Sequence, residues 1–194
     1  SSTTISTEPA DIVLVLDVSG SMDDYMTQYN AVYSLDKRKT YYIQQGGSYS
    51  QVTWSDRENS WGYSSGWFGK TWNSVTPKTS ASDTNANHVQ FYELASSYEK
   101  KIASLKNAVN NFIDSVAAKS PESQIALVKF AGNRSNWIGN DTYREGYYTY
   151  NYSQIVTELT DASKSASLKK AVNALKPAGA TRADYGMELA KGII

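Results

Sequence analysis

The sequence of 194 residues has no cysteine, one histidine and four prolines, and its charges cancel. Without cysteine, the chain has no disulfides, no thiolate nucleophiles and no cysteine-ligated zinc sites. The 19 basic and 19 acidic side chains give a formal net charge of +0, which disfavours a polybasic nucleic-acid binder and an acidic tail. With 40% hydrophobic and 20% charged residues, the composition is typical of a globular protein.

Long hydrophobic runs are also missing. The longest aliphatic run is IVLVL at 12–16, far shorter than the roughly 20 residues that cross a bilayer. Nothing before this run resembles a signal peptide. We therefore expect no membrane span in this chain.

The sequence contains few residues in patterns that are typical of an enzyme active site. His88, the only histidine, lies in a polar stretch, and such a residue is more often at the surface than catalytic. No pattern indicates a nucleophile with a base. Metal-assisted hydrolysis is the remaining catalytic alternative, because a cation can activate water, but no positioned general base accompanies it. We predict that the protein is not an enzyme.

Aromatic residues are abundant instead, with 15 Tyr and 5 Trp. Residues 1–10 are small and polar and predict a flexible leader before a domain at 11–194. From about 23 to 87, glycine, serine and aromatic residues interleave without a helical period, which indicates an inserted β-rich arm. Its rings either form the arm's own core or, at hairpin tips, stack on sugars, so glycan binding through this arm is an alternative function.

The rest of the chain alternates between strand and helix patterns. Two aliphatic segments, 11–16 and 124–130, predict buried strands, and 155–159 predicts a third strand at an edge. An apolar stripe from Tyr98 to Val116 predicts a long amphipathic helix that begins near Val89. This order indicates an α/β fold. Shorter helices are expected around 168–175 and from about Arg182, the latter with Met187, Ala190 and Ile194 turned inward.

The predicted fold looks unfinished. No strand follows the last helix, although α/β folds normally return to the sheet there. The first strand reads as central but lacks a neighbour on one side, which would leave it prone to aggregation. We therefore expect more polypeptide, either beyond Ile194 or as a second chain.

The motif that carries chemistry is Asp17-x-Ser19-x-Ser21, directly after the first strand. Ligands bind outside the carboxyl ends of strands in open α/β sheets, and a carboxylate with two hydroxyls can converge there on a hard cation. A distant second piece is Gly-Ala-Thr, ending at Thr181, before the last helix. Each piece also has a structural alternative as a helix cap, Ser21 with Asp24 and Thr181 with the acid at 184.

Taken together, these pieces resemble the von Willebrand factor type A domain over about 11–22 and 89–194. The resemblance implies a Rossmann-like, doubly wound and mostly parallel sheet. In that family the two loops form a metal-ion-dependent adhesion site, where a bound cation accepts an acidic side chain from a partner. The implied metal is Mg²⁺, or else Mn²⁺ or Ca²⁺. The implied metal-binding residues are Asp17, Ser19, Ser21 and Thr181.

The sequence also departs from the family. A further aspartate in a Thr-Asp-Gly context, and three more strands, have no counterpart, so the C-terminal part of the domain is absent from this chain and a second polypeptide is one way to complete it. The insertion resembles arms of adhesins on Gram-positive surface and pilus-tip proteins. The resemblance implies an extracellular, cell-surface protein, anchored outside this chain, that binds a host or matrix protein through an exposed carboxylate. A structural pilus or assembly subunit with a metal-rigidified site is the alternative.

Overall fold

The computed structural model describes residues 5–194, which form two compact units. We call residues 5–26 and 98–194 the α/β unit and residues 27–97 the arm. Residues 1–4 of the predicted leader lie outside the described residues. In the rest of that leader, Ile5 packs against the α/β core, and the N–H of Ala10 donates to Ser123 Oγ at 3.0 Å.

A three-stranded sheet forms the centre of the α/β unit, in the order β1 (Asp11–Asp17), β9 (Gln124–Phe130) and β12 (Gln154–Asp161). β1 runs parallel to β9, with Asp17 opposite Phe130, whereas β12 runs antiparallel to β9. The central strand is β9, and its residues 125–129 are buried, which explains its unbroken aliphatic pattern.

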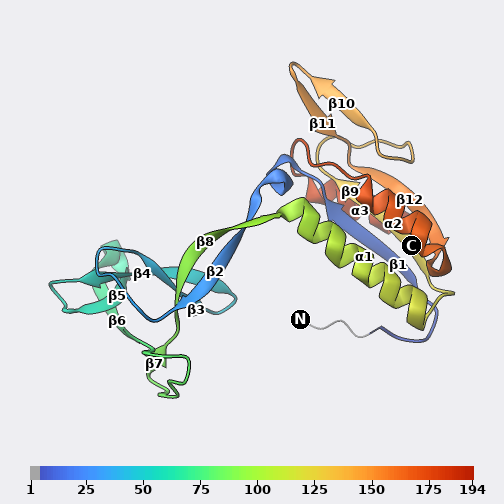
Figure 1. Cartoon of the computed structure of the whole chain (residues 1–194). Coiled ribbons are helices and arrows are strands. Elements are labelled where there is room, and N and C mark those ends of the chain that lie inside the picture. The colour runs from blue at the N-terminus through green and yellow to red at the C-terminus, as the bar shows by residue number, and fades with distance from the viewer. Residues whose placement is uncertain (1–4) are drawn as a thin grey trace. The chain divides into compact units, whose positions relative to one another are not determined.

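Helices cover both faces of this sheet (Figure 1). The buried sides of α1 (Lys101–Lys119) and α2 (Ser165–Asn173) share one core with Leu16 of β1. α3 (Ala183–Ile193) packs against the other face, at Val15, because successive strand residues point to opposite faces. Gly186 makes this contact possible, since a Cβ there would lie 2.9 Å from the Cβ of Phe130.

The predicted Rossmann-like, doubly wound and mostly parallel sheet is wrong. Strands make up 41% of the structure and helices 26%, and the largest sheet is a seven-stranded mixed sheet. In the three-stranded sheet, only β1 and β9 are parallel. A buried aliphatic strand looks alike in parallel and antiparallel sheets, so the sequence pattern did not reveal the direction of β12.

The predicted start of the long helix, near Val89, is also wrong. Residues there form β7 (His88–Val89) and β8 (Phe91–Lys100), and the helix α1 begins only at Lys101. β8 lies between β2 (Tyr25–Val32) and β3 (Tyr41–Gln45) in the seven-stranded sheet. Pairing with strands distant in sequence overrides the local helical spacing. Tyr98, predicted to face the core, is fully exposed.

The last helix also differs from the prediction in what it buries. Ala190 is buried as expected, but Met187 and Ile194 are exposed. The buried face of α3 consists instead of Gly186 and Ala190. Small residues allow the helix to approach the sheet closely, so long side chains are not needed to fill a gap there.

The arm has a hydrophobic core of its own. Tyr41, Val52, Trp61 and Phe91 are buried in it, and the ring of Trp61 meets those of Tyr41 and Phe91 edge to face, with centroids 5.4 and 5.8 Å apart. Such pairs add to the stabilisation from burial alone. The seven-stranded sheet, in the order β2-β8-β3-β4-β5-β6-β7, is completed by β4 (Ser48–Ser55), β5 (Ser60–Ser65) and β6 (Thr71–Pro77).

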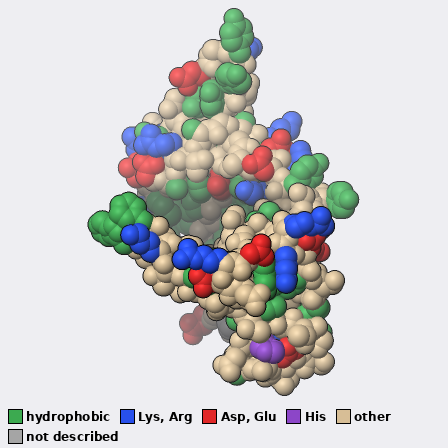
Figure 2. Space-filling view, turned by 90° about the vertical axis from the view of Figure 1, so that its left-hand side faces the viewer, with side chains coloured by type: hydrophobic (Ala, Val, Ile, Leu, Met, Phe, Trp, Pro, Cys, Tyr) green, Lys and Arg blue, Asp and Glu red, His purple; other side chains and the backbone are tan. Residues whose placement is uncertain are grey.

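Some hydrophobic side chains nevertheless stand out from the surface. Figure 2 shows hydrophobic side chains at several separate places on the surface. Between β5 and β6, in the short helix η2 (Trp67–Gly69), the side chains of Trp67 and Phe68 are 81% and 84% exposed. In the α/β unit, Trp137 and the hairpin of β10 (Thr142–Glu145) and β11 (Tyr148–Asn151) also present exposed rings. None of the helices in the described part of the chain has both the length and the apolarity of a membrane-crossing helix.

Candidate functional site

The end of β1 brings three side-chain oxygens together. Asp17 is the last residue of β1, and its Oδ1 accepts hydrogen bonds from the N–H of Ser19 at 2.9 Å and from Ser19 Oγ at 2.6 Å. Ser19 Oγ also lies 3.2 Å from Ser21 Oγ. The strand ends at Asp17, and the Asp17 carboxylate accepts the hydrogen bonds that close the following turn. In this turn, alternate side chains lie on the same side of the loop.

The spacing of the two serine oxygens fits a hard cation. Neighbouring ligands at right angles are about 2.9 Å apart around Mg²⁺ and about 3.4 Å apart around Ca²⁺, which brackets the 3.2 Å between Ser19 Oγ and Ser21 Oγ. Ser19 is fully buried, so its hydroxyl is held in one place. The other oxygen of the carboxylate, Asp17 Oδ2, accepts no hydrogen bond from residues 5–194. This set of one carboxylate and two hydroxyls has the chemistry that Mg²⁺, Mn²⁺ and Ca²⁺ prefer.

The second predicted loop lies directly against the first. The N–H of Gly20 donates to the carbonyl of Gly179 at 2.9 Å, and the N–H of Ala178 donates to the carbonyl of Val18 at 2.9 Å. Farther along, the N–H of Arg182 bonds the carbonyl of Ala131, just beyond β9, at 2.7 Å. The backbone of 178–182 therefore runs across the ends of β1 and β9.

Thr181 lies in this loop, but its hydroxyl does not touch the first loop. Its side chain is exposed and forms no hydrogen bond within the described structure. The capping alternatives for both loops are wrong: the N-cap of α3 is Arg182 and that of the helix η1 (Gly20–Asp23) is Ser19, and neither makes a side-chain capping bond. The structure thus brings Asp17, Ser19 and Ser21 together, whereas the loop of Thr181 meets the first loop through its backbone only.

Two of the acidic residues near the two loops, Asp23 and Asp184, are paired with basic ones. Asp23 Oδ1 is 2.9 Å from Lys100 Nζ. Arg182 donates two hydrogen bonds to Asp184, which lowers the pKa of that carboxyl. No group of three or more His, Asp or Glu side chains suited to a metal occurs in residues 5–194. The cluster of Asp17, Ser19 and Ser21 would itself give a bound cation one carboxylate and would leave its charge poorly neutralised.

His88 lies in the arm and organises a turn. Its Nδ1 is 2.7 Å from Asp83 Oδ2, and the pair is visible in Figure 2 as the single purple side chain beside a red one. The same carboxylate accepts the N–H of Thr79 and that of Asn85, and these bonds with His88 hold the pKa of Asp83 far below its ordinary value. Hydrogen bonds at a turn explain this histidine without catalysis.

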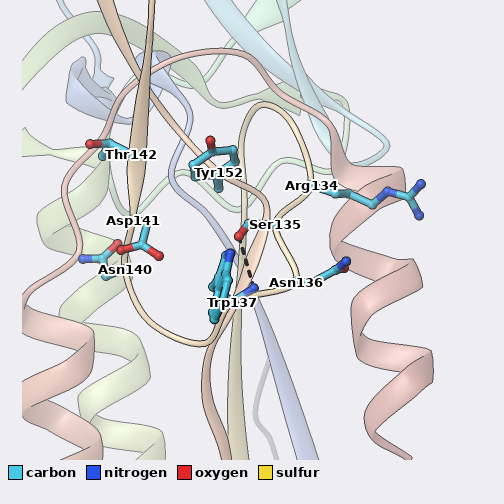
Figure 3. Close-up of a pocket in the computed structure, with 8 residues that line it drawn as sticks. All are labelled: Arg134, Ser135, Asn136, Trp137, Asn140, Asp141, Thr142 and Tyr152. Atoms are coloured by element: carbon cyan, nitrogen blue, oxygen red, sulfur yellow. Dashed lines mark hydrogen bonds between the residues drawn. The ribbon is translucent and has the colours of Figure 1, made fainter.

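A pocket that the sequence does not predict lies in the segment between β9 and β12. It has a volume of about 670 Å³, and Figure 3 shows the side chains around it. Asn140, Asp141 and Thr142 lie on one side, and Trp137 and Tyr152 lie across from them. The sequence predicts only a polar, tyrosine-rich stretch here, because the pocket forms when this loop folds back on itself and no local period indicates that fold.

A buried lysine holds one wall of this pocket. Lys129, in the centre of β9, is 0% exposed. Its Nζ donates to Asn140 Oδ1 and to the carbonyl of Asp141, each at 2.8 Å. Burial lowers the pKa of Lys129 to about 8, and the charge of Asp141 offsets part of that effect. The lysine thus fixes an exposed loop from inside the sheet.

We expect Lys129 to make stability depend on pH. Its pKa is about 8 in the folded protein and 10.5 ordinarily, so the folded state bears the cost of a buried charge below pH 8 and loses that cost as pH rises to 10.5. Compared with Lys129→Met, the wild type should gain about 2 to 3 kcal/mol between about pH 7 and about pH 10. Urea unfolding of both proteins at the two pH values measures this gain. A difference between the proteins that does not change with pH would refute the shifted pKa, since other titrating groups are common to both.

Comparisons with known proteins add little to this geometry. No family model matches the sequence, and no curated protein matches it. Among solved structures, the chain is similar to an uncharacterized membrane spanning protein from Vibrio fischeri, with 14% sequence identity and a TM-score of 0.41. The match covers 96% of this chain and 49% of the other, so the chain spans about half the length of that protein. We base no functional argument on a likeness of this extent.

Proposed function

We propose that the α/β unit binds an acidic group of a protein partner through a divalent cation held at the end of β1. The observation that carries the proposal is the cluster of oxygens around Ser19 Oγ, which lies 2.6 Å from Asp17 Oδ1 and 3.2 Å from Ser21 Oγ. The two loops also match those of the metal-ion-dependent adhesion site in the family that the sequence resembles. No catalytic group accompanies the cluster, so binding is the activity that we propose.

The hydrogen bonds of the first loop prepare its oxygens for a cation. The hydroxyl proton of Ser19 is donated to Asp17 Oδ1, so Ser19 Oγ accepts from Ser21 Oγ with one lone pair and keeps the other for a cation. The backbone N–H of Ser19 bonds the same oxygen, which fixes the carboxylate and leaves Oδ2 free. When bound, the cation supplies an open coordination position for an outside carboxylate.

Thr181 is the fourth residue of the proposed site. The carbonyl of Gly179 in the same loop accepts a hydrogen bond from the N–H of Gly20, and the hydroxyl of Thr181 would act as a ligand either directly or through a water molecule. Because serine and threonine hydroxyls are neutral, they bind the ion without cancelling its charge. The ion therefore keeps its attraction for an acidic partner.

We further propose that this module acts at the surface of a bacterial cell and binds a host or matrix protein. The support is the resemblance to adhesins of Gram-positive surface and pilus-tip proteins. If the site serves only assembly with a neighbouring subunit, binding should be found with that subunit and not with matrix proteins. Immobilised matrix proteins, tested with and without EDTA and after methyl esterification of their carboxyl groups, separate these cases.

Replacing Asp17 by alanine tests the cation site directly. We expect Asp17→Ala to weaken Mn²⁺ binding more than tenfold, because the variant loses the only carboxylate and the acceptor that orients Ser19. Calorimetric titration of the full chain with Mn²⁺, Mg²⁺ and Ca²⁺ measures the affinity. Asp11→Ala is the matched control, since Asp11 is an exposed aspartate at the other end of the same strand.

The two variants together test whether the cation binds at the end of β1. Asp11→Ala should bind Mn²⁺ like the wild type, and both variants should keep the wild-type circular dichroism spectrum. If Asp17→Ala also binds Mn²⁺ like the wild type, the cation does not bind at the end of β1 and the proposed function is wrong.

A further inference from the structure

The pocket between β9 and β12 presents a large aromatic ring to solvent. The side chain of Trp137 is 79% exposed at its rim. Single exposed hydrophobic residues are common on protein surfaces, so exposure alone indicates no function. A second observation, the way in which the loop of Trp137 is held, indicates a binding role.

Buried polar side chains fix the loop that carries Trp137. Gln154 is fully buried, and its Nε2 donates to the carbonyl of Trp137 and to Asp141 Oδ2, each at 2.9 Å. Its Oε1 accepts the N–H of Asp141 at 2.9 Å. Lys129 holds the same loop through Asn140 and Asp141. Burying a lysine and a glutamine is costly unless both are paired, and here the pairing rigidifies an exposed loop before any ligand arrives.

The pocket also contains polar groups that lack partners in the protein. Asp141 Oδ1, the hydroxyl of Thr142 and the hydroxyl of Tyr152 form no hydrogen bonds with residues 5–194. All three line the same pocket as Trp137, and Figure 3 shows Asp141 and Thr142 on one side of it, with Tyr152 near the indole. They offer both hydrogen-bond donors and acceptors beside an aromatic face.

The charged side chains at the pocket favour a neutral ligand over an anionic one. Arg134 at the edge of the pocket donates to Glu188 Oε2 at 2.6 Å and lies over the ring of Tyr185, so Glu188 offsets its attraction for an anionic ligand. The free acceptor of Asp141 favours hydroxyl donors and repels anions. At about 670 Å³, the pocket has the size of a small-molecule site, which is about 300 to 1,000 Å³.

From this arrangement we infer that the pocket at Trp137 binds a neutral saccharide residue. The C–H face of a sugar ring packs on the indole, while its hydroxyl groups bond Asp141, Thr142 and Tyr152. The pre-fixed loop lowers the entropy cost of binding. This site is distinct from the cation cluster at the end of β1 and from the aromatic residues of the arm.

The test is saturation-transfer NMR of the full chain with a panel of neutral methyl glycosides, of glucose, galactose, mannose and N-acetylglucosamine. We expect at least one glycoside to receive saturation, with an affinity that falls more than tenfold in Trp137→Ala. Trp137→Phe should retain most of the binding, because it keeps an aromatic face. Trp67→Ala is the matched control, since Trp67 is an equally exposed tryptophan in the arm.

The outcomes separate this inference from the proposed function. Sugar binding should persist in EDTA and in Asp17→Ala, even if the cation site fails its own test. Absence of binding for the whole panel would refute the inference, and so would equal binding by Trp137→Ala and the wild type. Loss of binding in Trp67→Ala alone would move sugar recognition to the arm, and loss in EDTA would move it to the cation, each of which overturns the assignment to this pocket.

Discussion

Replacing Phe91 by alanine should unfold the arm while the α/β unit stays folded. Phe91 is 0% exposed and packs against Trp61 and Tyr41 in the arm's own core. Truncating a buried phenylalanine costs about 3 to 5 kcal/mol, which is much of the stability of a domain this small. The core of the α/β unit consists of other residues, so the substitution removes no contact there.

Two spectroscopic signals report the two units separately. Trp54, Trp61, Trp67 and Trp72 lie in the arm and only Trp137 lies in the α/β unit, so tryptophan fluorescence reports mainly the arm. The α-helices α1, α2 and α3 all lie in the α/β unit, so helical circular dichroism reports that unit. In Phe91→Ala, the fluorescence transition should move to much lower urea and the helical transition should not.

The matched control is Leu168→Ala, which removes a fully buried side chain from α2. Here the helical signal should fall first and the tryptophan fluorescence should be nearly unchanged. If the fluorescence and helical transitions move to lower urea together in either variant, the two units unfold cooperatively. The prediction that residues 27–97 unfold independently would then be wrong.

Gly179→Ala should separate the two loops of the candidate cation site. The backbone of Gly179 has φ +94°, which only glycine adopts readily, and a Cβ there would lie 2.6 Å from Tyr150 Cδ1 and 3.2 Å from Tyr150 Cα. The loop must move to relieve this clash, and its bonds to Gly20 and Val18 then break. We expect a loss of about 3 kcal/mol in stability and more than tenfold weaker Mn²⁺ binding.

Urea unfolding followed by helical circular dichroism and calorimetric titration measure the two effects. Gly47→Ala is the control, because a Cβ at Gly47 meets nothing within 4 Å and its backbone is not in the left-handed region. If Gly179→Ala keeps the wild-type affinity for Mn²⁺ while losing stability, the second loop supports the fold and takes no part in cation binding.

Local patterns predicted the parts of the molecule that local sequence determines. The aliphatic runs at 11–16 and 124–130 do form neighbouring strands. The contact among Asp17, Ser19 and Ser21 spans five consecutive residues, so the strand end and the alternation of side chains suffice to predict it. The separate arm core follows from the density of aromatic residues, since an insertion without long helices needs such side chains to bury.

The features that the sequence did not reveal depend on distant pairing. β8 is extended because β2 and β3 flank it, although the spacing from Tyr98 onward is helical. The pocket depends on contacts of Lys129 with Asn140 and of Gln154 with Trp137. Lys129 lies in an aliphatic strand and Gln154 begins the strand β12. No local sequence pattern around either residue predicts which residues it contacts.

The order of strands in the seven-stranded sheet makes the arm exchangeable. The chain enters the arm through β2 and leaves it through β8, and these two strands are neighbours. A short turn can therefore bridge the same two points without stretching the backbone on either side. Evolution, or an engineer, can graft arms of different length and shape at this junction while the loops at the end of β1 keep their geometry.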